Sequence, residues 1–146
     1  MTDKSKTVDI EREKQTLLGM HAKSREAHFA TAVEAAIEDL AEEQIIVRDG
    51  AVRRMTKGDM RQIMTGYLAG ATFHEWDDIE PPLIKVSDDA SLAWMITNTR
   101  VRFTKADENG NESETAFVYA GILTLENRDG RWVRTGNIST FAAGNE

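Results

Sequence analysis

The sequence predicts an α+β fold, with three N-terminal helices packed on a curved, mainly antiparallel sheet. Helix-type patterns end near residue 70, every later segment is typical of a strand, and short turn signals separate those strands. Helices and strands that are segregated along a chain indicate α+β rather than alternating α/β architecture. The 146 residues suit one domain. We therefore assign residues 8–146 to one domain and the polar residues 1–7 to a flexible N-terminus.

The first two helices are expected within residues 8–40. Residues 8–29 contain no proline and many strong helix formers. Thr31 followed by Glu34 fits a capping box, which would start a second helix. Apolar residues then recur at helical spacing, at Val33, Ala36, Ile37 and Leu40.

A hairpin and a third helix follow. The β-branched run 44–47 precedes the turn dipeptide Asp49-Gly50, and residues 51–55 form the returning strand. Thr56 and Asp59 resemble a capping box at the start of the third helix. The apolar stripe of that helix consists of Met60, Ile63, Met64, Tyr67 and Leu68.

Four longer strands are expected after residue 70, at 72–86, 92–104, 115–126 and 131–141. Pro81-Pro82 interrupts the first of them, which predicts a bulge or an edge strand. Asp88-Asp89, Asn109-Gly110 and Asp129-Gly130 mark the connections between the strands.

Both faces of the predicted sheet are apolar. In the strand at 92–104, Trp94 and Ile96 share one face, while Met95 and Val101 share the other. A sheet with one wet face would alternate apolar and polar residues. Helices would cover one face, and we expect a second copy of the chain to cover the outer face in a homodimer. The alternative is that sheet curvature and loops cover it.

Composition excludes several kinds of partner. A net charge of −7 disfavours binding to nucleic acid or to an anionic membrane. No segment is apolar enough over a sufficient length to span a bilayer. The chain has no cysteine, so it has no disulfide or thiolate chemistry, and we expect a cytoplasmic location.

Several local strings stand out along the chain. They are Arg25-Glu26-Ala27-His28-Phe29, Val47-Arg48-Asp49-Gly50, Trp76-Asp77-Asp78-Ile79-Glu80-Pro81-Pro82, Val86-Ser87-Asp88-Asp89 with Trp94, and Arg128-Asp129-Gly130-Arg131-Trp132. In this order they resemble the SnoaL-like/DUF4440 branch of the NTF2-like superfamily. The resemblance covers about residues 8–141. It implies the cystatin-like cone, in which a bent sheet wraps helices around an internal pocket. It implies no single activity, because this superfamily contains isomerases, cyclases, dehydratases and transport factors.

Eight residues are candidates for lining such a pocket. His28 is a hydrogen-bonding candidate, and Arg25, one helical turn before it, could help to hold an anionic group. Asn98 is a polar residue on an apolar strand face and needs a partner. Aromatic rings beside it would suit a small, mostly apolar ligand. The full set is Arg25, His28, Tyr67, His74, Trp76, Trp94, Asn98 and Tyr119.

A metal or cofactor site is not expected. His21 and His28 lie two helical turns apart, about 10 Å, which is too far for them to share one ion. No phosphate loop, nucleophile elbow or dinucleotide fingerprint occurs.

Three functional hypotheses remain open. The first is a dimeric domain that binds a small, mostly apolar molecule between helices and sheet. The second is an isomerase, cyclase or dehydratase that uses His28, His74 or a carboxylate of residues 72–80 for proton transfer. The third is a dimeric interaction module without a ligand. We favour the first hypothesis, because the later strands carry no interior acid.

Overall fold

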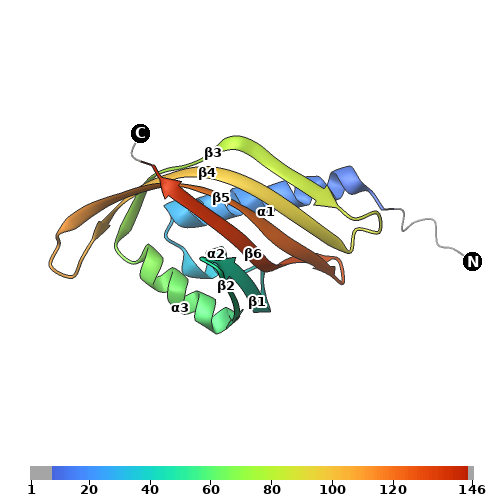
Figure 1. The fold of residues 1–146 in the computed structure, drawn as a ribbon, viewed down its shortest axis with the longest axis horizontal. Helices are drawn as coiled ribbons and strands as arrows, with labels where there is room; N and C mark the ends of the chain where they lie inside the picture. Colours follow the sequence, from blue (N-terminus) through green and yellow to red (C-terminus); the bar gives the residue numbers. More distant parts are fainter. Residues whose placement is uncertain (1–7, 145–146) are drawn as a thin grey trace, which may run out of the picture.

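The computed structural model describes residues 8–144, which form three helices and six strands (Figure 1). In chain order these are α1 (Ile10–Phe29), α2 (Val33–Ile37), β1 (Leu40–Arg48), β2 (Ala51–Thr56), α3 (Lys57–Leu68), β3 (Ala71–Val86), β4 (Leu92–Ala106), β5 (Glu112–Arg128) and β6 (Arg131–Ala143). This order confirms the α+β prediction. The flexibility expected for residues 1–7 concerns a segment outside the described residues.

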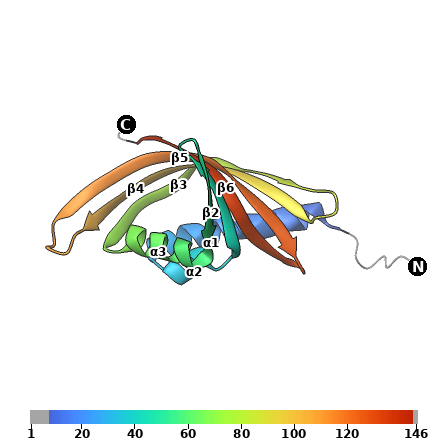
Figure 2. The same cartoon turned by 60° about the horizontal axis from the view of Figure 1, so that its bottom comes forward.

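The described strands join one sheet in the order β2-β1-β6-β5-β4-β3. Neighbouring strands are antiparallel, except that β1 runs parallel to β6. Figure 2 shows the sheet arching over the three helices, which lie on its concave side. The helices therefore cover one face of the sheet, and the described residues leave the convex face open.

Two helix starts follow the rules of capping. The Asp9 side chain accepts a hydrogen bond from the Arg12 amide at the start of α1. At α3, the Thr56 side chain accepts from the Asp59 amide, and the Asp59 carboxylate accepts from the Thr56 amide. The capping box expected at α3 is confirmed.

The capping box expected at α2 is wrong. Ala32 is the residue that precedes α2, and its side chain makes no capping hydrogen bond. Thr31 instead adopts a left-handed conformation with φ of 49°, and its hydroxyl bonds to the Ala30 carbonyl. The tight turn between α1 and α2 therefore uses Thr31 as its corner. The second helix is also shorter than expected, because Leu40 already pairs with Arg134 of β6.

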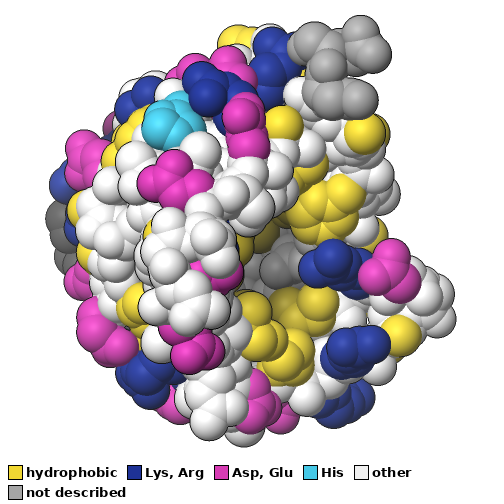
Figure 3. All heavy atoms as spheres, turned by 90° about the vertical axis from the view of Figure 1, so that its left-hand side faces the viewer, with side chains coloured by type: hydrophobic (Ala, Val, Ile, Leu, Met, Phe, Trp, Pro, Cys, Tyr) yellow, Lys and Arg dark blue, Asp and Glu magenta, His cyan; other side chains and the backbone are white. Residues whose placement is uncertain are grey.

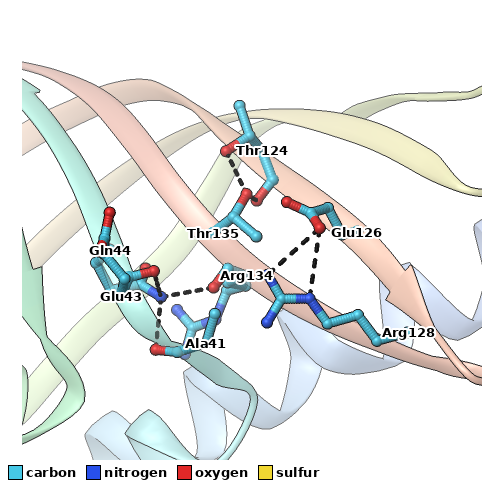
Figure 4. A network of polar contacts seen from close by, with 8 residues as sticks. All are labelled: Ala41, Glu43, Gln44, Thr124, Glu126, Arg128, Arg134 and Thr135. Atoms are coloured by element: carbon cyan, nitrogen blue, oxygen red, sulfur yellow. Dashed lines mark hydrogen bonds and ion pairs between the residues drawn. The ribbon is translucent and has the colours of Figure 1, made fainter.

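A buried glutamine joins β1 to β6 where their pairing is irregular. The register shifts between Leu40 and Ile45. The Gln44 amide fills this gap by donating to the carbonyls of Ala41, at 3.0 Å, and Arg134, at 2.7 Å (Figure 4). These bonds satisfy a side chain that is only 1% exposed.

The proline pair lies where the sequence predicted an interruption. β3 is an edge strand, and its pairing with β4 shifts between Glu80 and Leu83. Proline lacks the amide hydrogen that a central strand needs, so an edge position with a bulge tolerates it.

Two clusters of buried side chains form the core between helices and sheet. One is centred on Leu17, Met95, Leu125 and Trp132, and the other on Leu68, Phe73, Val101 and Phe103. Within the described residues, no helix combines the length and the apolar character needed to cross a bilayer.

Candidate functional site

A cavity of about 640 Å³ lies between the helices and the concave face of the sheet. All three helices contribute to its walls, and members of both core clusters line it. Figure 3 shows a recess on one face of the molecule, with hydrophobic side chains gathered along it and basic side chains nearby. Sites for small ligands typically enclose roughly 300–1,000 Å³, so the volume is suitable for one.

Most of the cavity wall is apolar and adaptable. Four methionines line it, two of them from α3, and they are joined by five aromatic rings. Methionine side chains are flexible and polarisable, so they adjust to differently shaped apolar surfaces. These residues are Met20, Met60, Met64, Met95, Tyr67, Trp76, Phe117, Tyr119 and Phe141.

Helix α1 directs three polar residues toward the cavity. His21, Ser24 and His28 are spaced three and four residues apart, so they share one face of the helix. The Trp76 ring of β3 lies against both histidines, with ring centroids 5.3 Å from His21 and 5.1 Å from His28. Contact between α1 and β3 therefore fixes both imidazoles beside the cavity.

The tautomer of His28 follows from its hydrogen bond. Its Nδ1 lies 2.7 Å from the Ser24 carbonyl oxygen, which can only accept, so Nδ1 carries the hydrogen. Nε2 is then an acceptor. Burial is the main cause that lowers the pKa of His28, and the positive charge of Arg134 lowers it further, while the bond to Ser24 opposes both. His28 is thus a neutral imidazole at pH 7.

Two tyrosine hydroxyls in the cavity are held in the protonated form. Burial raises the pKa of Tyr67 to about 12, and it also raises the pKa of Tyr119. The Tyr67 ring lies edge-on to His28, with centroids 5.7 Å apart. At neutral pH both hydroxyls can therefore donate a hydrogen bond to a ligand.

An ion pair lies in the cavity wall where α2, β1 and β6 meet. The Arg134 Nε donates to the Asp39 carboxylate at 2.6 Å, and Nη2 donates to the Ala36 carbonyl at 2.6 Å. The side chains are only 19% and 23% exposed for Arg134 and Asp39, respectively. The carboxylate holds the guanidinium in one orientation beside the cavity.

A second polar pair lies beside Trp76. The His21 Nε2 is 2.8 Å from the Asp78 carboxylate of β3, and the His21 side chain is 12% exposed. Asp78 itself does not line the cavity. The pair ties α1 to the edge strand and orients the His21 ring.

The structure brings four of the eight candidate residues to the cavity and places four elsewhere. The residues that line it are His28, Tyr67, Trp76 and Tyr119. Whether these residues bind a ligand stays a prediction.

The other four candidates make contacts away from the cavity. Arg25 donates to the Trp76 carbonyl and to the Asp77 carboxylate on the protein surface. His74 contacts the Thr104 hydroxyl at 3.1 Å. Trp94 is 39% exposed on the convex face of the sheet. Asn98 finds its partner in the Tyr119 carbonyl of the neighbouring strand, at 3.1 Å.

Sequence reasoning did not select Asp39, Arg134 or His21 for the site. Arg134 was not selected because of a bulge in β6. Thr124 pairs with Gly136, and the next residue of β5, Leu125, pairs with Arg134, so β6 has one extra residue there. The alternation of side chains between the two sheet faces is therefore interrupted before Arg134. Asp39 lies between the short helix α2 and strand β1, in a stretch that the sequence predicted as helix. From the sequence, His21 is considered only as a metal ligand together with His28.

In the part of the chain that the structure describes, acidic and imidazole side chains do not converge on a cation site. Within residues 8–144, no group of three or more His, Asp or Glu residues is placed to hold a metal ion. The carboxylates Glu75, Asp77, Asp78 and Glu80 lie outside the cavity wall.

Comparison with known proteins gives structural matches only. The sequence matches no protein-family model, and no curated protein matches it in sequence. A protein from Exiguobacterium sibiricum, named as a calcium/calmodulin-dependent kinase II association domain, is similar with a TM-score of 0.69 and 12% identity, over 99% of each chain. An NTF2-like protein from Cytophaga hutchinsonii gives 0.63 and 12%, over 88% of this chain and 98% of that one. A ketosteroid isomerase-like protein from Erwinia carotovora atroseptica gives 0.62 and 14%, over 86% and 92%.

Proposed function

Because the chain has the NTF2-like, cystatin-like fold of these structures, we propose that it binds a small, mostly apolar molecule in the cavity between helices and sheet. The cavity itself carries this proposal. It measures about 640 Å³, and apolar side chains, among them four methionines and five aromatic residues, form most of its wall. Burying an apolar molecule there would remove roughly 25 cal/mol of unfavourable hydration per Å² of apolar surface.

Binding of a neutral fluorescent probe, N-phenyl-1-naphthylamine, would test this proposal. We expect saturable fluorescence enhancement with the native chain. Ser139 lines the cavity, and Ser139→Phe would extend a ring into it. We expect this variant to bind the probe at least about tenfold more weakly, because the ring occupies ligand volume.

The neighbouring Thr140→Phe variant is the matched control. Thr140 lies on the same strand, is exposed and does not line the cavity, because adjacent strand residues point to opposite faces. Its probe affinity should equal that of the native chain. No probe binding by the native chain, or equal binding by Ser139→Phe, would contradict the proposal.

A second candidate function is proton transfer on a carbonyl compound, and the geometry of His28 favours it. Its Nδ1 is bonded to Ser24, so Nε2 is an available base. Tyr67, whose ring lies edge-on to the His28 ring and whose hydroxyl is protonated, would supply a donor for a developing enolate oxygen. Such a base would remove the proton from the carbon next to a ligand carbonyl.

Deuterium exchange would separate the two functions. A small apolar ketone is incubated with the protein in deuterated buffer, and the loss of its α-hydrogen signal is followed by NMR. Exchange that depends on His28, and is lost in His28→Gln, would support the enzyme. Probe binding without exchange would leave the binding function alone.

The convex face of the sheet supports a homodimer as the working form. One aliphatic residue from every strand forms a continuous row across this face, as the pairing register places each beside the next. This outer row consists of Val52, Val47, Ile138, Ile122, Ile96 and Leu83. Similar structures include proteins named as association domains, which agrees with assembly. Membership of the SnoaL-like/DUF4440 branch also stays a proposal.

A further inference from the structure

We infer that the molecule bound in the cavity has an apolar body and one carboxylate, and that Arg134 binds this carboxylate. The inference rests on the proposed binding function and adds the chemical class of the ligand. It follows from the charges of the cavity wall and from the hydrogen bonds of one guanidinium.

The cavity wall has an excess of positive charge in an acidic protein. Two arginines, Arg48 and Arg134, line it, whereas Asp39 is the one carboxylate among the described lining residues. The chain as a whole has a net charge of −7. Asp39 pairs with Arg134, and the exposed Asp49, outside the wall, lies 3.4 Å from Arg48. Counted over the lining residues alone, two cations face one carboxylate, which favours an anionic ligand over a cationic one.

Arg134 retains hydrogen-bonding capacity after its protein contacts are counted. A guanidinium has five N–H groups. Nε donates to Asp39, and Nη2 donates to the Ala36 carbonyl while lying 2.6 Å from the same Asp39 oxygen. Nη1 has no acceptor among the described residues.

This Nη1 group is accessible rather than sealed in the protein. Among the described residues, no fully buried side-chain nitrogen or oxygen lacks a hydrogen-bond partner. The unpaired Nη1 therefore reaches open space, and Arg134 lines both this cavity and a smaller adjoining one of about 260 Å³. Asp39 and Ala36 hold the guanidinium in place, so little side-chain entropy is lost when an anion binds.

Arg48 marks the mouth of the same cavity. Its guanidinium lies over the Phe141 ring, 4.5 Å from the ring centroid, its Nε is 3.4 Å from the exposed Asp49 carboxylate, and its side chain is 55% exposed. Phe141 is also 46% exposed although it lines the cavity. A cation on an apolar rim attracts an anionic, apolar molecule toward the interior.

Displacement of bound N-phenyl-1-naphthylamine by a matched pair of compounds tests the inference. Decanoate and decanol have the same chain length but differ in charge at pH 7.5. We expect decanoate to displace the probe at a concentration about tenfold lower than decanol, which is the effect of one hydrogen bond between charged groups.

A double variant assigns this preference to Arg134. Asp39→Asn/Arg134→Gln replaces the ion pair by two amides, so no charge is left unpaired. We expect the preference for decanoate to fall to about threefold or less, while decanol displaces the probe as in the native chain. Arg48→Gln at the exposed rim should lower the preference less.

The surface pair Glu34 and Arg61 provides the matched control. Its atoms approach to 2.8 Å, but neither residue lines the cavity. Glu34→Gln/Arg61→Gln changes the same charges and should keep the full preference for decanoate.

The outcomes separate this inference from the proposed function. Probe binding with equal displacement by decanoate and decanol would overturn the inference and leave the binding function intact. A preference that survives in Asp39→Asn/Arg134→Gln would overturn the assignment to Arg134. Failure of the native chain to bind the probe would overturn both.

Discussion

At the scale of single residues, His28 shows how position decides chemistry. The residue lies in the last turn of α1, is largely removed from water, donates to the Ser24 carbonyl and lies near the positive charge of Arg134. Burial and Arg134 disfavour the imidazolium and lower the pKa of His28 below its usual value of 6.5. The folded protein therefore prefers the neutral ring.

This preference predicts a loss of stability in acid. The unfolded chain takes up a proton at His28 near pH 6.5, whereas the folded chain does so only at lower pH. The contribution of His28 is thus complete above pH 6.5 and is lost as the pH falls toward the lowered value. Between these limits the free energy of unfolding should fall by at most about 1.4 kcal/mol per pH unit through this group. Urea denaturation at a series of pH values measures the slope.

Two substitutions isolate the His28 contribution. His28→Gln should flatten the dependence between pH 7 and the lowered pKa. The exposed His74 makes only a 3.1 Å contact with the Thr104 hydroxyl, so His74→Gln should retain the native slope. Identical slopes in the native chain and in His28→Gln would exclude His28 as the cause.

At the scale of elements, the parallel pairing of β1 with β6 joins two strands that both contribute residues to the cavity wall. Gly136 pairs with Ile45 at this contact. A Cβ atom added to Gly136 would lie 2.3 Å from the Ile45 carbonyl oxygen and 3.4 Å from the Ile45 Cβ. The two strands can approach this closely only because residue 136 has no side chain.

We therefore expect Gly136→Ala to lower the free energy of unfolding by roughly 1–3 kcal/mol, as overpacking against backbone typically does. Gly66→Ala in α3 should do the opposite. Nothing lies within 4 Å of its added Cβ, and alanine is favoured over glycine inside a helix by roughly 0.5–1 kcal/mol. Chemical denaturation of both variants provides the comparison. Equal stability of Gly136→Ala and the native chain would mean that β1 and β6 are not paired so closely.

Local signals made the elements with strong end markers predictable. The capping box of α3, the hairpin turn at Asp49-Gly50 and the interruption at Pro81-Pro82 all follow from residue chemistry within a few positions. The start of α2 was not predictable, because Thr31 takes a left-handed turn conformation that its capping chemistry does not suggest. At Thr31, the packing of α1 against α2 determines the backbone conformation, and the preference of threonine for the cap position does not.

The candidate site was predictable only in part for a related reason. Periodicity places Tyr67 on the apolar stripe of α3, and the structure has it in the cavity wall. Alternation on β5 puts Tyr119 on one face with Phe117 and Leu123, but both faces are apolar, so the sequence does not decide which of them is inward. The inward position of Arg134 could not be predicted, because the extra residue in β6 reverses the alternation of side chains between the two faces of the sheet. Gly136 beside the extra residue is the one local signal, because a glycine inside a strand often marks a bulge, but only the pairing register shows which residue is extra.

At the scale of the whole molecule, the two faces of the sheet are suited to different tasks. The concave face lines the cavity, and the convex face carries the outer row of aliphatic residues. In this row Val52 is 69% exposed, Leu83 57% and Ile138 48%. Contiguous apolar surface of this kind marks an interaction site in a folded protein. Pairing of two such faces would leave both cavities accessible, since the cavities lie on the opposite side.

The homodimer makes a specific prediction about mass in solution. Light scattering after size-exclusion chromatography should give twice the 16.3 kDa mass of the chain at micromolar concentration. Ile138 lies near the middle of the outer row, so Ile138→Lys would bring two like charges into the buried centre of the interface. We expect this variant to run at the mass of one chain, with probe binding in the cavity unchanged.

Ile63→Lys is a close control, because Ile63 is the same residue type with the same exposed fraction of 48%, but it lies on α3 rather than on the sheet. It should keep the mass of the native assembly. A native chain that runs at 16.3 kDa would contradict the dimer, and an Ile138→Lys variant that stays paired would move the interface away from the outer row. If Ile138→Lys dissociates the dimer and also abolishes probe binding, the two faces are coupled, because the Ile138 side chain itself does not line the cavity.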